Sequence, residues 1–482
     1  MLVGTSMAAF ENAFLAQSVT AEVESKLKAL LESIADGELF KTNEEAFLVS
    51  IYNAFRREID YLKTAYVANT IPPKALASLA PSEILFNERY PEVDRTLTGV
   101  LILRWIYHND YDGFTRNQPS RMRLTQESFR KLRNFFQAEL DDFRDSSKIL
   151  TLITLQVTND LGKSEELKDM FVMGGFGDGD VNHDMLLHRV LTTCPALVPS
   201  IQALDTNGTM RGLIALSSEY NPGQLTQGES MPALLEALPK SGLTVEGFRL
   251  KFMESFLDIS GALGHIDHDG SFIMTDPVFI AYDHARRASE RVLRGDDAVE
   301  AWKDVLGMRL EILQQRLWHG AENWDVNSNE QHLAKARLLC MARAVKEDVA
   351  NKVNQAFDHY LTDSDQDLLT KGLNVIGDSR TPAVLPTYIP EMFSLVFREL
   401  GDRDLEIQLQ GLSAVMSYLG RVLHLSGSDL TCIRPGVLVV ERDMKEILKP
   451  IIESTEFHED PWSVLNDQVE LPRMQIAREV VL

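Results

Sequence analysis

Apolar residues recur every three to four positions over several long stretches of this chain. In residues 43–67 the apolar stripe consists of Phe47, Ile51, Phe55, Ile59 and Leu62. This spacing puts the side chains on one face of an α-helix, and that face must be buried against other elements. The same pattern occurs in residues 125–144, 329–361, 403–424 and 442–453, of which 329–361 fits one long helix or two stacked ones. We therefore predict an all-α, multi-helix globular fold.

Signals for other structure are few. Residues 436–441 (GVLVVE) are the clearest β-rich run, and it is short. Residues 376–390 contain three prolines and separate the long helical block from the C-terminal helices. We predict an N-terminal helical region (1–90), a central region (91–295) and a C-terminal helical region (296–482), which could share one continuous core.

The overall charge excludes some classes of partner. The chain has 482 residues with 48 Lys and Arg against 71 Asp and Glu, a formal charge of −23. Nucleic-acid binding needs a basic surface, and anionic membranes repel acidic proteins.

No segment has the roughly 20 uncharged apolar residues of a membrane span. The first 18 residues lack the basic start of a signal peptide, and the three cysteines form no CxxC pair. We expect a cytoplasmic protein that binds a small-molecule substrate, without nucleic-acid or membrane partners.

The acidic residues are concentrated in two stretches. Residues 169–188 contain four acids and residues 252–285 contain six, and neither stretch has a Lys or Arg. Together they also hold five of the eleven histidines. Clustered carboxylates repel one another unless a positive charge lies among them. We expect either a divalent metal (Mg, Mn or Fe) bound by carboxylate and imidazole ligands, or acidic loops that are solvated separately.

The first candidate constellation follows the apolar run ILTLITLQV. Thr158-Asn159-Asp160-Leu161-Gly162-Lys163 presents polar side chains where a buried helix ends. Asp160 is placed as a metal ligand, and Asn159 is placed to contact a substrate. The alternative is an ordinary helix C-terminus in which Gly162 is the cap and Lys163 faces the negative end of the helix dipole.

The second constellation is Asn182-His183-Asp184, which opens the helical sequence MLLHRVL. His183 and Asp184 could supply a nitrogen and an oxygen to one cation. His188, one turn beyond Asp184, could support them. The alternative is an acidic first turn of a helix, with no ligand.

Together, LQVTNDLGK and NHDMLLHRVL resemble the HD-domain superfamily of helical, metal-dependent proteins. That superfamily has an HDIGK or HDLGK helix end, a later histidine and a distal aspartate around one or two metals. The resemblance implies an HD-like helical core with added N- and C-terminal helices. It also implies that Asp160, His183 and Asp184 bind metal, with Asp267 or Asp269 as the distal aspartate. Asn159 stands where the motif has a ligating histidine.

The third constellation is Gly264–Asp276, with His265, Asp267 and Asp269 ahead of Gly270. Asp267, Asp269 and Asp276 match positions 3, 5 and 12 of an EF-hand loop, but His265 replaces the first aspartate and the bidentate Glu is missing. The segment could be a calcium loop, part of the shared metal or substrate site, or a polar turn between helices.

A fourth pattern, Asp141-Asp142-Phe143-Arg144-Asp145, has the letters of the DDxxD motif of class I terpene cyclases. On a helix, Asp141 and Asp145 would share one face.

These patterns leave three hypotheses for function. The first is a metal-dependent hydrolase or lyase of small-molecule, including secondary, metabolism that acts on a phosphorylated or similar substrate. Its catalytic residues would be Lys163 and His188, and Arg286 and Arg287 would bind the substrate. The second is a helical terpene cyclase or lyase that ionises a prenyl diphosphate. The third is a non-enzymatic scaffold or partner-binding protein.

Overall fold

The computed structural model describes residues 21–66, 74, 76, 78–177, 179, 181–205, 208–217, 220–466 and 468–479. The chain forms two compact units. Unit 1 consists of Met1–Ser218 and Leu243–Ile280, and unit 2 of Glu219–Gly242 and Ala281–Leu482. The chain passes from one unit to the other three times, and all three points lie inside the predicted central region, 91–295. The expectation about a signal peptide concerns residues outside the described part of the chain.

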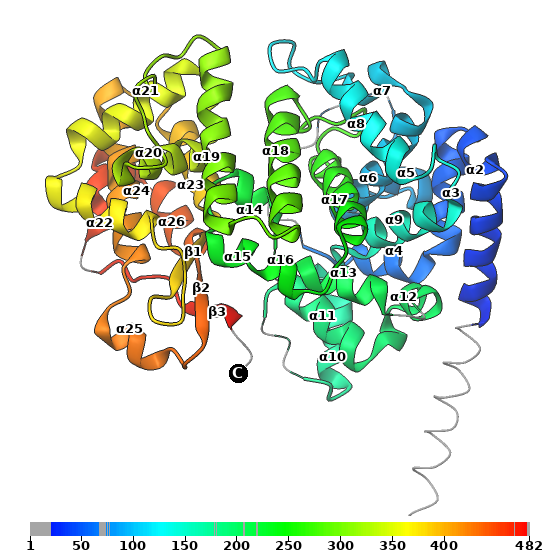
Figure 1. Ribbon diagram of the computed structural model, residues 1–482. Coiled ribbons are helices and arrows are strands. Elements are labelled where there is room, and N and C mark those ends of the chain that lie inside the picture. The colour runs from blue at the N-terminus through cyan, green and yellow to red at the C-terminus, as the bar shows by residue number, and fades with distance from the viewer. Residues whose placement is uncertain are drawn as a thin grey trace, which may run out of the picture. The chain divides into compact units, whose positions relative to one another are not determined.

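Unit 1 is built from helices in its described residues (Figure 1). A first helix covers residues 21–35. The next elements are α2 (Glu38–Lys41), α3 (Glu44–Ala54), α4 (Arg56–Leu62), α5 (Pro81–Phe86), α6 (Pro91–His108), α7 (Tyr111–Thr115), α8 (Gln126–Glu139), α9 (Ser146–Thr158), the 3₁₀ turn η1 (Leu161–Lys163), α10 (Glu165–Met173), α11 (His183–Thr193), η2 (Pro195–Leu197), α12 (Pro199–Leu204), α13 (Thr209–Ser217) and α17 (Val245–Gly261).

Helices α6, α9 and α17 pack against one another in the middle of unit 1. The close approach of α6 and α17 depends on glycines. A Cβ atom on Gly261 would lie 2.6 Å from both the Arg95 carbonyl oxygen and the Gly99 nitrogen. On Gly264 it would lie 2.4 Å from Thr98 Oγ1. The two helices are therefore close enough for polar side chains on them to meet in the interior.

Unit 2 combines helices with a small sheet. Its elements are α14 (Pro222–Thr226), α15 (Pro232–Leu235), α16 (Ala237–Lys240), α19 (Ala298–Gln315), α20 (Glu330–Met341), α21 (Glu347–Gln355), the π-helical η3 (Ala356–Tyr360), α22 (Asp363–Leu373), β1 (Ala383–Thr387), α23 (Ile389–Glu399), α24 (Leu405–Leu423), α25 (Gly427–Cys432), β2 (Val437–Asp443), α26 (Met444–Ile452), α27 (Thr455–Glu459), η4 (Pro461–Leu465) and β3 (Met474–Glu479). The boundary between the units falls inside α18 (Asp276–Leu293).

The sheet has the strand order β1-β2-β3. Strand β1 pairs parallel to β2 from Ala383 with Val439 to Thr387 with Asp443, and β3 pairs antiparallel to β2. The predicted β run at 436–441 is confirmed as β2. The proline-rich stretch 376–390 is not only a divider, because it contains β1. Pro386 is tolerated there because β1 is an edge strand, where a missing N–H costs no ladder bond on the open side.

The all-α prediction is confirmed at the level of fold class, because helices make up most of the described chain and the sheet is small. Two predicted boundaries differ. The stretch 43–67 is two helices, α3 and α4, because Phe55 between them leaves the helical conformation with φ −116° and ψ 34°. The stretch 329–361 divides into α20, α21 and η3. Within the described residues, no helix combines the length and the apolar character that crossing a membrane requires.

Candidate acid–base site in unit 1

The first two predicted constellations meet in unit 1. The helix α9 ends at Thr158, and the turn η1 that follows it contacts the start of α11. Gly162 makes this contact possible, because a Cβ atom there would lie 1.9 Å from the His183 carbonyl oxygen. The N-terminus of α11 is capped by Asn182, whose side chain accepts a hydrogen bond from the Met185 N–H. The chain thus holds Asp160 and His183 beside each other.

Lys163 and Glu92 surround the Asp160 carboxylate. Lys163 Nζ lies 2.7 Å from Asp160 Oδ1 and 3.1 Å from Glu92 Oε1. Arg95, one turn along α6, donates to Glu92 Oε2 at 3.0 Å. The Glu92 side chain is fully buried, and those of Asp160 and Lys163 are only 9% and 12% exposed. The positive charges that the acidic stretches require are thus supplied here by the protein itself.

His183 lies on the side of this cluster nearest to solvent. Its Nε2 atom is 3.9 Å from Asp160 Oδ1 and 3.7 Å from Asp184 Oδ1. The His183 and Asp184 side chains are 23% and 22% exposed, so they are accessible where Asp160 is not. An imidazole in contact with solvent is therefore positioned next to a buried carboxylate.

Helix α17 adds a second row of charges. Lys251 is ion-paired with Glu254, and Lys251 Nζ also lies 3.5 Å from Asn159 Oδ1. Glu254 is 1% exposed. Asp258, one turn further along α17, interacts electrostatically with Asp160. The cluster therefore extends from α6 through η1 to α17.

Burial and mutual repulsion shift the pKa values of these carboxyl groups in opposite directions. Burial and the Asp160 charge raise the pKa of Glu92 to about 8. Burial also favours the neutral form of Asp160, but the Lys163 charge and a hydrogen bond from Glu92 outweigh it and hold the Asp160 pKa far below its usual value. Burial raises the pKa of Glu254 to about 7. Glu92 is therefore the carboxyl group of the pair that takes up a proton more readily, whereas the Lys163 charge favours the ionised form of Asp160.

This arrangement has the physical parts of an acid–base site. Neighbouring carboxyl groups whose pKa values are pushed apart can serve as a proton donor and a proton acceptor in one place. An ionised carboxylate beside an imidazole orients the ring, and the ring can then move a proton at the solvent-facing edge. The structure brings together four of the predicted residues, namely Asp160, Lys163, His183 and Asp184.

The predicted residues Asn159 and His188 lie on the same elements but have different surroundings. Asn159 accepts from Lys251 and so belongs to the interior of the cluster. His188 is half-buried on α11, five residues beyond His183. Five residues rotate the helix direction by about 140°, so the two imidazoles leave α11 on different faces.

The turn 265–269 is held by other partners. Asp267 accepts from Lys74 Nζ at 2.6 Å and from Asn117 Nδ2 at 2.9 Å. Ser78 donates to Asp269 at 2.6 Å and shares a hydrogen bond with His268 at 3.1 Å. His265 is buried in the same turn. These contacts are those of a polar turn between helices.

The last residue of the EF-hand alignment, Asp276, contacts a different part of unit 1. Asp276, at the aligned position 12, accepts hydrogen bonds from the backbone and hydroxyl of Thr125 at 2.9 Å. Asp276 therefore contacts the residue that caps α8. These contacts favour the polar-turn interpretation, and the calcium loop stays an untested alternative.

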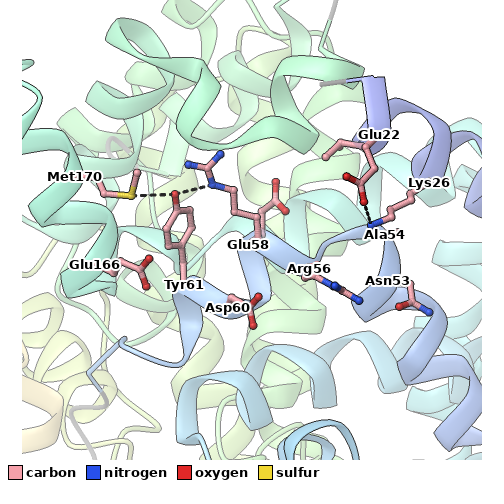
Figure 2. A pocket seen from close by; sticks show the side chains of 12 residues that line it. Glu22, Lys26, Asn53, Ala54, Arg56, Glu58, Asp60, Tyr61, Glu166 and Met170 are labelled. Atoms are coloured by element: carbon pink, nitrogen blue, oxygen red, sulfur yellow. Dashed lines mark hydrogen bonds and ion pairs between the residues drawn. The ribbon is translucent and has the colours of Figure 1, made fainter. Parts of the chain in front are cut away.

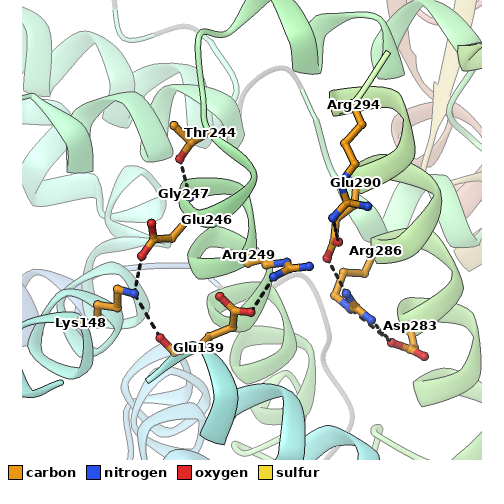
Figure 3. A network of polar contacts seen from close by, with 10 residues as sticks. All are labelled: Glu139, Lys148, Thr244, Glu246, Gly247, Arg249, Asp283, Arg286, Glu290 and Arg294. Atoms are coloured by element: carbon orange, nitrogen blue, oxygen red, sulfur yellow. Dashed lines mark hydrogen bonds and ion pairs between the residues drawn. The ribbon is translucent and has the colours of Figure 1, made fainter. Parts of the chain in front are cut away.

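The predicted substrate-binding arginines belong to unit 2. Figure 3 shows Arg286 on α18 between Asp283 and Glu290, with Nη2 2.7 Å from Asp283 Oδ1 and Nη1 2.5 Å from Glu290 Oε1. Arg287 is ion-paired with the same Asp283. Both guanidinium groups are thus neutralised along their own helix.

The DDxxD letters do not lie on a helix. Asp141, Asp142 and Phe143 have φ values of 50°, 56° and 60°, so they form a left-handed turn after α8. Asp145 caps the N-terminus of α9 by accepting from the Lys148 N–H. The expectation that Asp141 and Asp145 share a helix face is wrong, because the turn separates α8 from α9.

The side chains around Asp160 do not fit the metal site that the HD resemblance implies. The Lys163 ammonium already lies 2.7 Å from one oxygen of the Asp160 carboxylate. Asn159, in place of the histidine, binds Lys251. Among the described residues, no group of three or more His, Cys, Asp or Glu side chains has the arrangement of metal ligands. A network of ion pairs therefore occupies the position where the resemblance places a metal.

Five members of the cluster were not predicted as site residues, namely Glu92, Arg95, Lys251, Glu254 and Asp258. Their signal in the sequence is weak. Glu92 and Arg95 lie in PEVDRTLTGVLILRW, where charges precede an apolar run that forms the buried helix α6. Lys251 lies between Leu250 and Phe252 in a helix that is otherwise buried on one side.

Comparison with known proteins places the chain in a family. Residues 48–465, which cover most of both units, match the family described as "Family of unknown function (DUF6829)". The chain belongs to this family. No curated protein and no solved structure matches it. The family match includes every residue of the cluster around Asp160.

Proposed function

We propose that this chain is an enzyme of small-molecule metabolism, a hydrolase or lyase, whose acid–base site is the cluster around Asp160 and His183. The observation that carries the proposal is the partly exposed His183 imidazole 3.9 Å from the buried Asp160 carboxylate, whose other neighbours are Lys163 and Glu92. Strongly shifted pKa values in opposite directions are typical of groups that transfer protons.

The residues have separate roles in the proposal. His183 transfers the proton to or from the substrate, because it is the accessible group. Asp160 orients the imidazole and compensates its charge. Lys163 contributes positive charge toward an anionic substrate group, such as a phosphate, at the edge of the cluster.

The HD-like core and the divalent metal (Mg, Mn or Fe) stay predictions. They rest on the resemblance of TNDLGK and NHD to the HD superfamily. A metal at Asp160, His183 and Asp184 would require Lys163 to leave Asp160, because its ammonium now lies 2.7 Å from that carboxylate. Metal binding and catalysis can be tested together.

The test compares wild type with Asp160→Asn and His183→Gln. Each protein is screened against phosphomonoesters, phosphodiesters and prenyl diphosphates, with and without Mg²⁺, Mn²⁺ or Fe²⁺, and its thermal unfolding is followed with and without each metal. We expect turnover of a phosphorylated substrate by wild type and a loss of at least about a hundredfold in His183→Gln, since general acid–base catalysis contributes roughly 10²–10⁴-fold.

The matched control is His424→Gln, which replaces an exposed histidine in unit 2. It is expected to keep wild-type turnover. If His183→Gln and Asp160→Asn keep full turnover, the site assignment is wrong. If wild type turns over no substrate class and Asp160→Asn only unfolds at lower temperature, the cluster is a structural core and the scaffold hypothesis is favoured. A metal that raises the unfolding temperature of wild type but not of Asp160→Asn would support the metal prediction.

A further inference from the structure

Unit 1 has a second concave surface, whose lining includes no residue of the cluster around Asp160. It is a pocket of about 380 Å³ lined by the first helix (residues 21–35), the end of α3, α4 and α10. Figure 2 shows Arg56, Glu58 and Tyr61 of α4 with Met170 of α10 around it. This volume lies in the range of small-molecule sites. The roles proposed above for Asp160 and His183 do not use it.

Arg57 is fixed in this pocket by Tyr61. Its Nε atom donates to the Tyr61 hydroxyl at 2.9 Å, and its guanidinium lies 5.7 Å from the centre of the Tyr61 ring. Tyr61 is held in turn by a contact between its hydroxyl and Met170 Sδ at 3.4 Å. Because Nε is occupied, the two terminal nitrogens of Arg57 keep their N–H groups for a planar, two-oxygen partner.

Arg56 adds a second positive charge from the neighbouring position. Its guanidinium lies 5.4 Å from the centre of the Tyr52 ring. In the part of the chain that the structure describes, no carboxylate forms an ion pair with either Arg56 or Arg57. Two adjacent arginines are therefore held near aromatic rings without a direct ion pair among the described residues.

The carboxylates of the same pocket are largely engaged elsewhere. Glu22 pairs with Lys26 at 2.6 Å, and Asp60 pairs with Lys63 at 2.6 Å. Glu58 is 1% exposed and accepts from the Ser200 N–H at 2.9 Å. Burial raises the pKa of Glu58, which reduces its negative charge beside the arginines. Glu166 also lines the pocket, from α10, and an anionic group is expected beside the arginines and not beside Glu166.

We propose that this pocket binds a small molecule through a carboxylate or phosphate group held by Arg57 and Arg56. The apolar part of the ligand packs against Met170 and Val23, which line the same pocket and are accessible there. Oxyanions of both kinds match the fork of a guanidinium group, and the apolar lining selects ligands with a hydrocarbon or aromatic body. The site is independent of the acid–base site, and its test needs no turnover.

The experiment is isothermal titration of the full-length chain with benzoate, phenyl phosphate and inorganic phosphate, and with neutral benzamide as the uncharged analogue. We expect saturable binding of benzoate or phenyl phosphate and none of benzamide. Preference for phenyl phosphate assigns a phosphate ligand, and preference for benzoate assigns a carboxylate. Equal binding of inorganic phosphate and phenyl phosphate would contradict the apolar part of the site.

The variants are Arg57→Gln, Arg57→Lys and Arg56→Gln, with Arg144→Gln as the matched control. Arg144 is an exposed arginine of unit 1 that pairs with Asp142. Arg57→Gln should weaken binding roughly tenfold or more, and Arg57→Lys should weaken it too, because lysine keeps the charge but not the fork. Arg144→Gln should bind like wild type. Arg57→Lys and Arg56→Gln keep the test decisive if Arg57→Gln does not fold. Unchanged affinity in all the Arg56 and Arg57 variants, or no saturable binding to wild type, would overturn the proposal.

Discussion

At Gly162 there is no room for a side chain, and the position of His183 depends on that. A Cβ atom would lie 1.9 Å from the His183 carbonyl oxygen. Because this oxygen belongs to the backbone, no side-chain rotation can relieve the clash. We expect Gly162→Ala to destabilise the protein by about 3 kcal/mol, at the upper end of what overpacking costs, because η1 must move away from α11. Denaturant unfolding of the variant measures this.

The control is Gly212→Ala in α13. Gly212 has open space around its Cα, so the new methyl group meets nothing within 4 Å. Alanine favours a helix over glycine by roughly 0.5–1 kcal/mol, so this variant should be slightly more stable than wild type. Equal destabilisation of the two variants would contradict the role given to the contact between η1 and α11.

The buried Glu229 of unit 2 makes stability depend on pH. Burial raises its pKa from 4.5 to about 8, against a smaller opposite effect of the Arg343 charge. Between these two pH values the folded state holds a proton that the unfolded state releases. The stabilisation is therefore complete below about pH 4.5 and is lost as the pH rises toward 8.

Glu229→Gln should remove this dependence, because an amide stays neutral. We expect similar stability of variant and wild type at pH 5, and a variant more stable by about 2–4 kcal/mol at pH 8. Guanidinium unfolding at pH 5, 6.5 and 8 checks the difference. Glu311→Gln, which changes an exposed glutamate of α19, should leave the pH dependence as in wild type. Parallel curves for wild type and Glu229→Gln would show that Glu229 does not hold the proton.

At the scale of elements, Arg337 of α20 joins three segments of unit 2. Its side chain is 1% exposed and donates to the carbonyl oxygens of Gly228 at 2.5 Å and Glu229 at 2.7 Å, and to that of Leu373. Its guanidinium also lies 5.5 Å from the centre of the Trp302 ring. The loop before α15 and the end of α22 are thus tied to α20 by one side chain.

Arg337→Lys should cost roughly 3–5 kcal/mol of unfolding free energy although it keeps the charge. One ammonium group cannot reach three carbonyl oxygens that a planar fork satisfies, and buried carbonyls without donors are costly. Chemical unfolding measures the loss. Arg380→Lys, at an exposed position, is the comparison and should be neutral. A neutral Arg337→Lys would show that the three carbonyls find other donors.

At the scale of the whole molecule, unit 2 depends on a segment that is distant in sequence. Met231, Ala233 and Leu234 form one apolar cluster with residues of β1 and β2. Trp302 Nε1 also donates to the Ser230 carbonyl at 2.9 Å. We therefore expect the fragment 281–482 alone to lack a cooperative unfolding transition, because the segment that completes its core is missing.

A chimera in which residues 219–242 precede 281–482 through a flexible linker should regain that transition. Circular dichroism during thermal unfolding distinguishes the two fragments. If the fragment 281–482 unfolds cooperatively without the segment, the segment is an addition to unit 2 and not part of its core.

Local patterns predicted the helices well and the sheet poorly. The stretches 403–424 and 442–453 correspond closely to α24 and α26. The apolar stripe that predicts each helix lies in the sequence of that helix alone. Strand β1 was not predicted, because the three prolines of residues 376–390 suggest a break between helices. What makes it a strand is parallel pairing with β2, more than fifty residues later. The residues of β1 alone do not show which strand they pair with.

The candidate site was predicted in part for the same reason. Asp160 and His183 were found because each lies at a helix end with a recognisable pattern. Glu92 and Lys251 were not found, because they lie in helices whose pattern is that of ordinary buried segments. Only the crossing of α6, α9 and α17 brings them to Asp160.

Periodicity and composition are local properties, and they were enough to establish the helical class, the positions of several long helices and the acidic character of the chain. Which charges meet was settled by the folded arrangement. Asp267 meets Lys74 and Asn117, whereas Asp160 meets Lys163 and Glu92. Each carboxylate therefore acquires at least one partner, and with it part of its electrostatic surroundings, from a segment distant in sequence. Burial and the distance between charges set these properties, and both exist only in the folded chain.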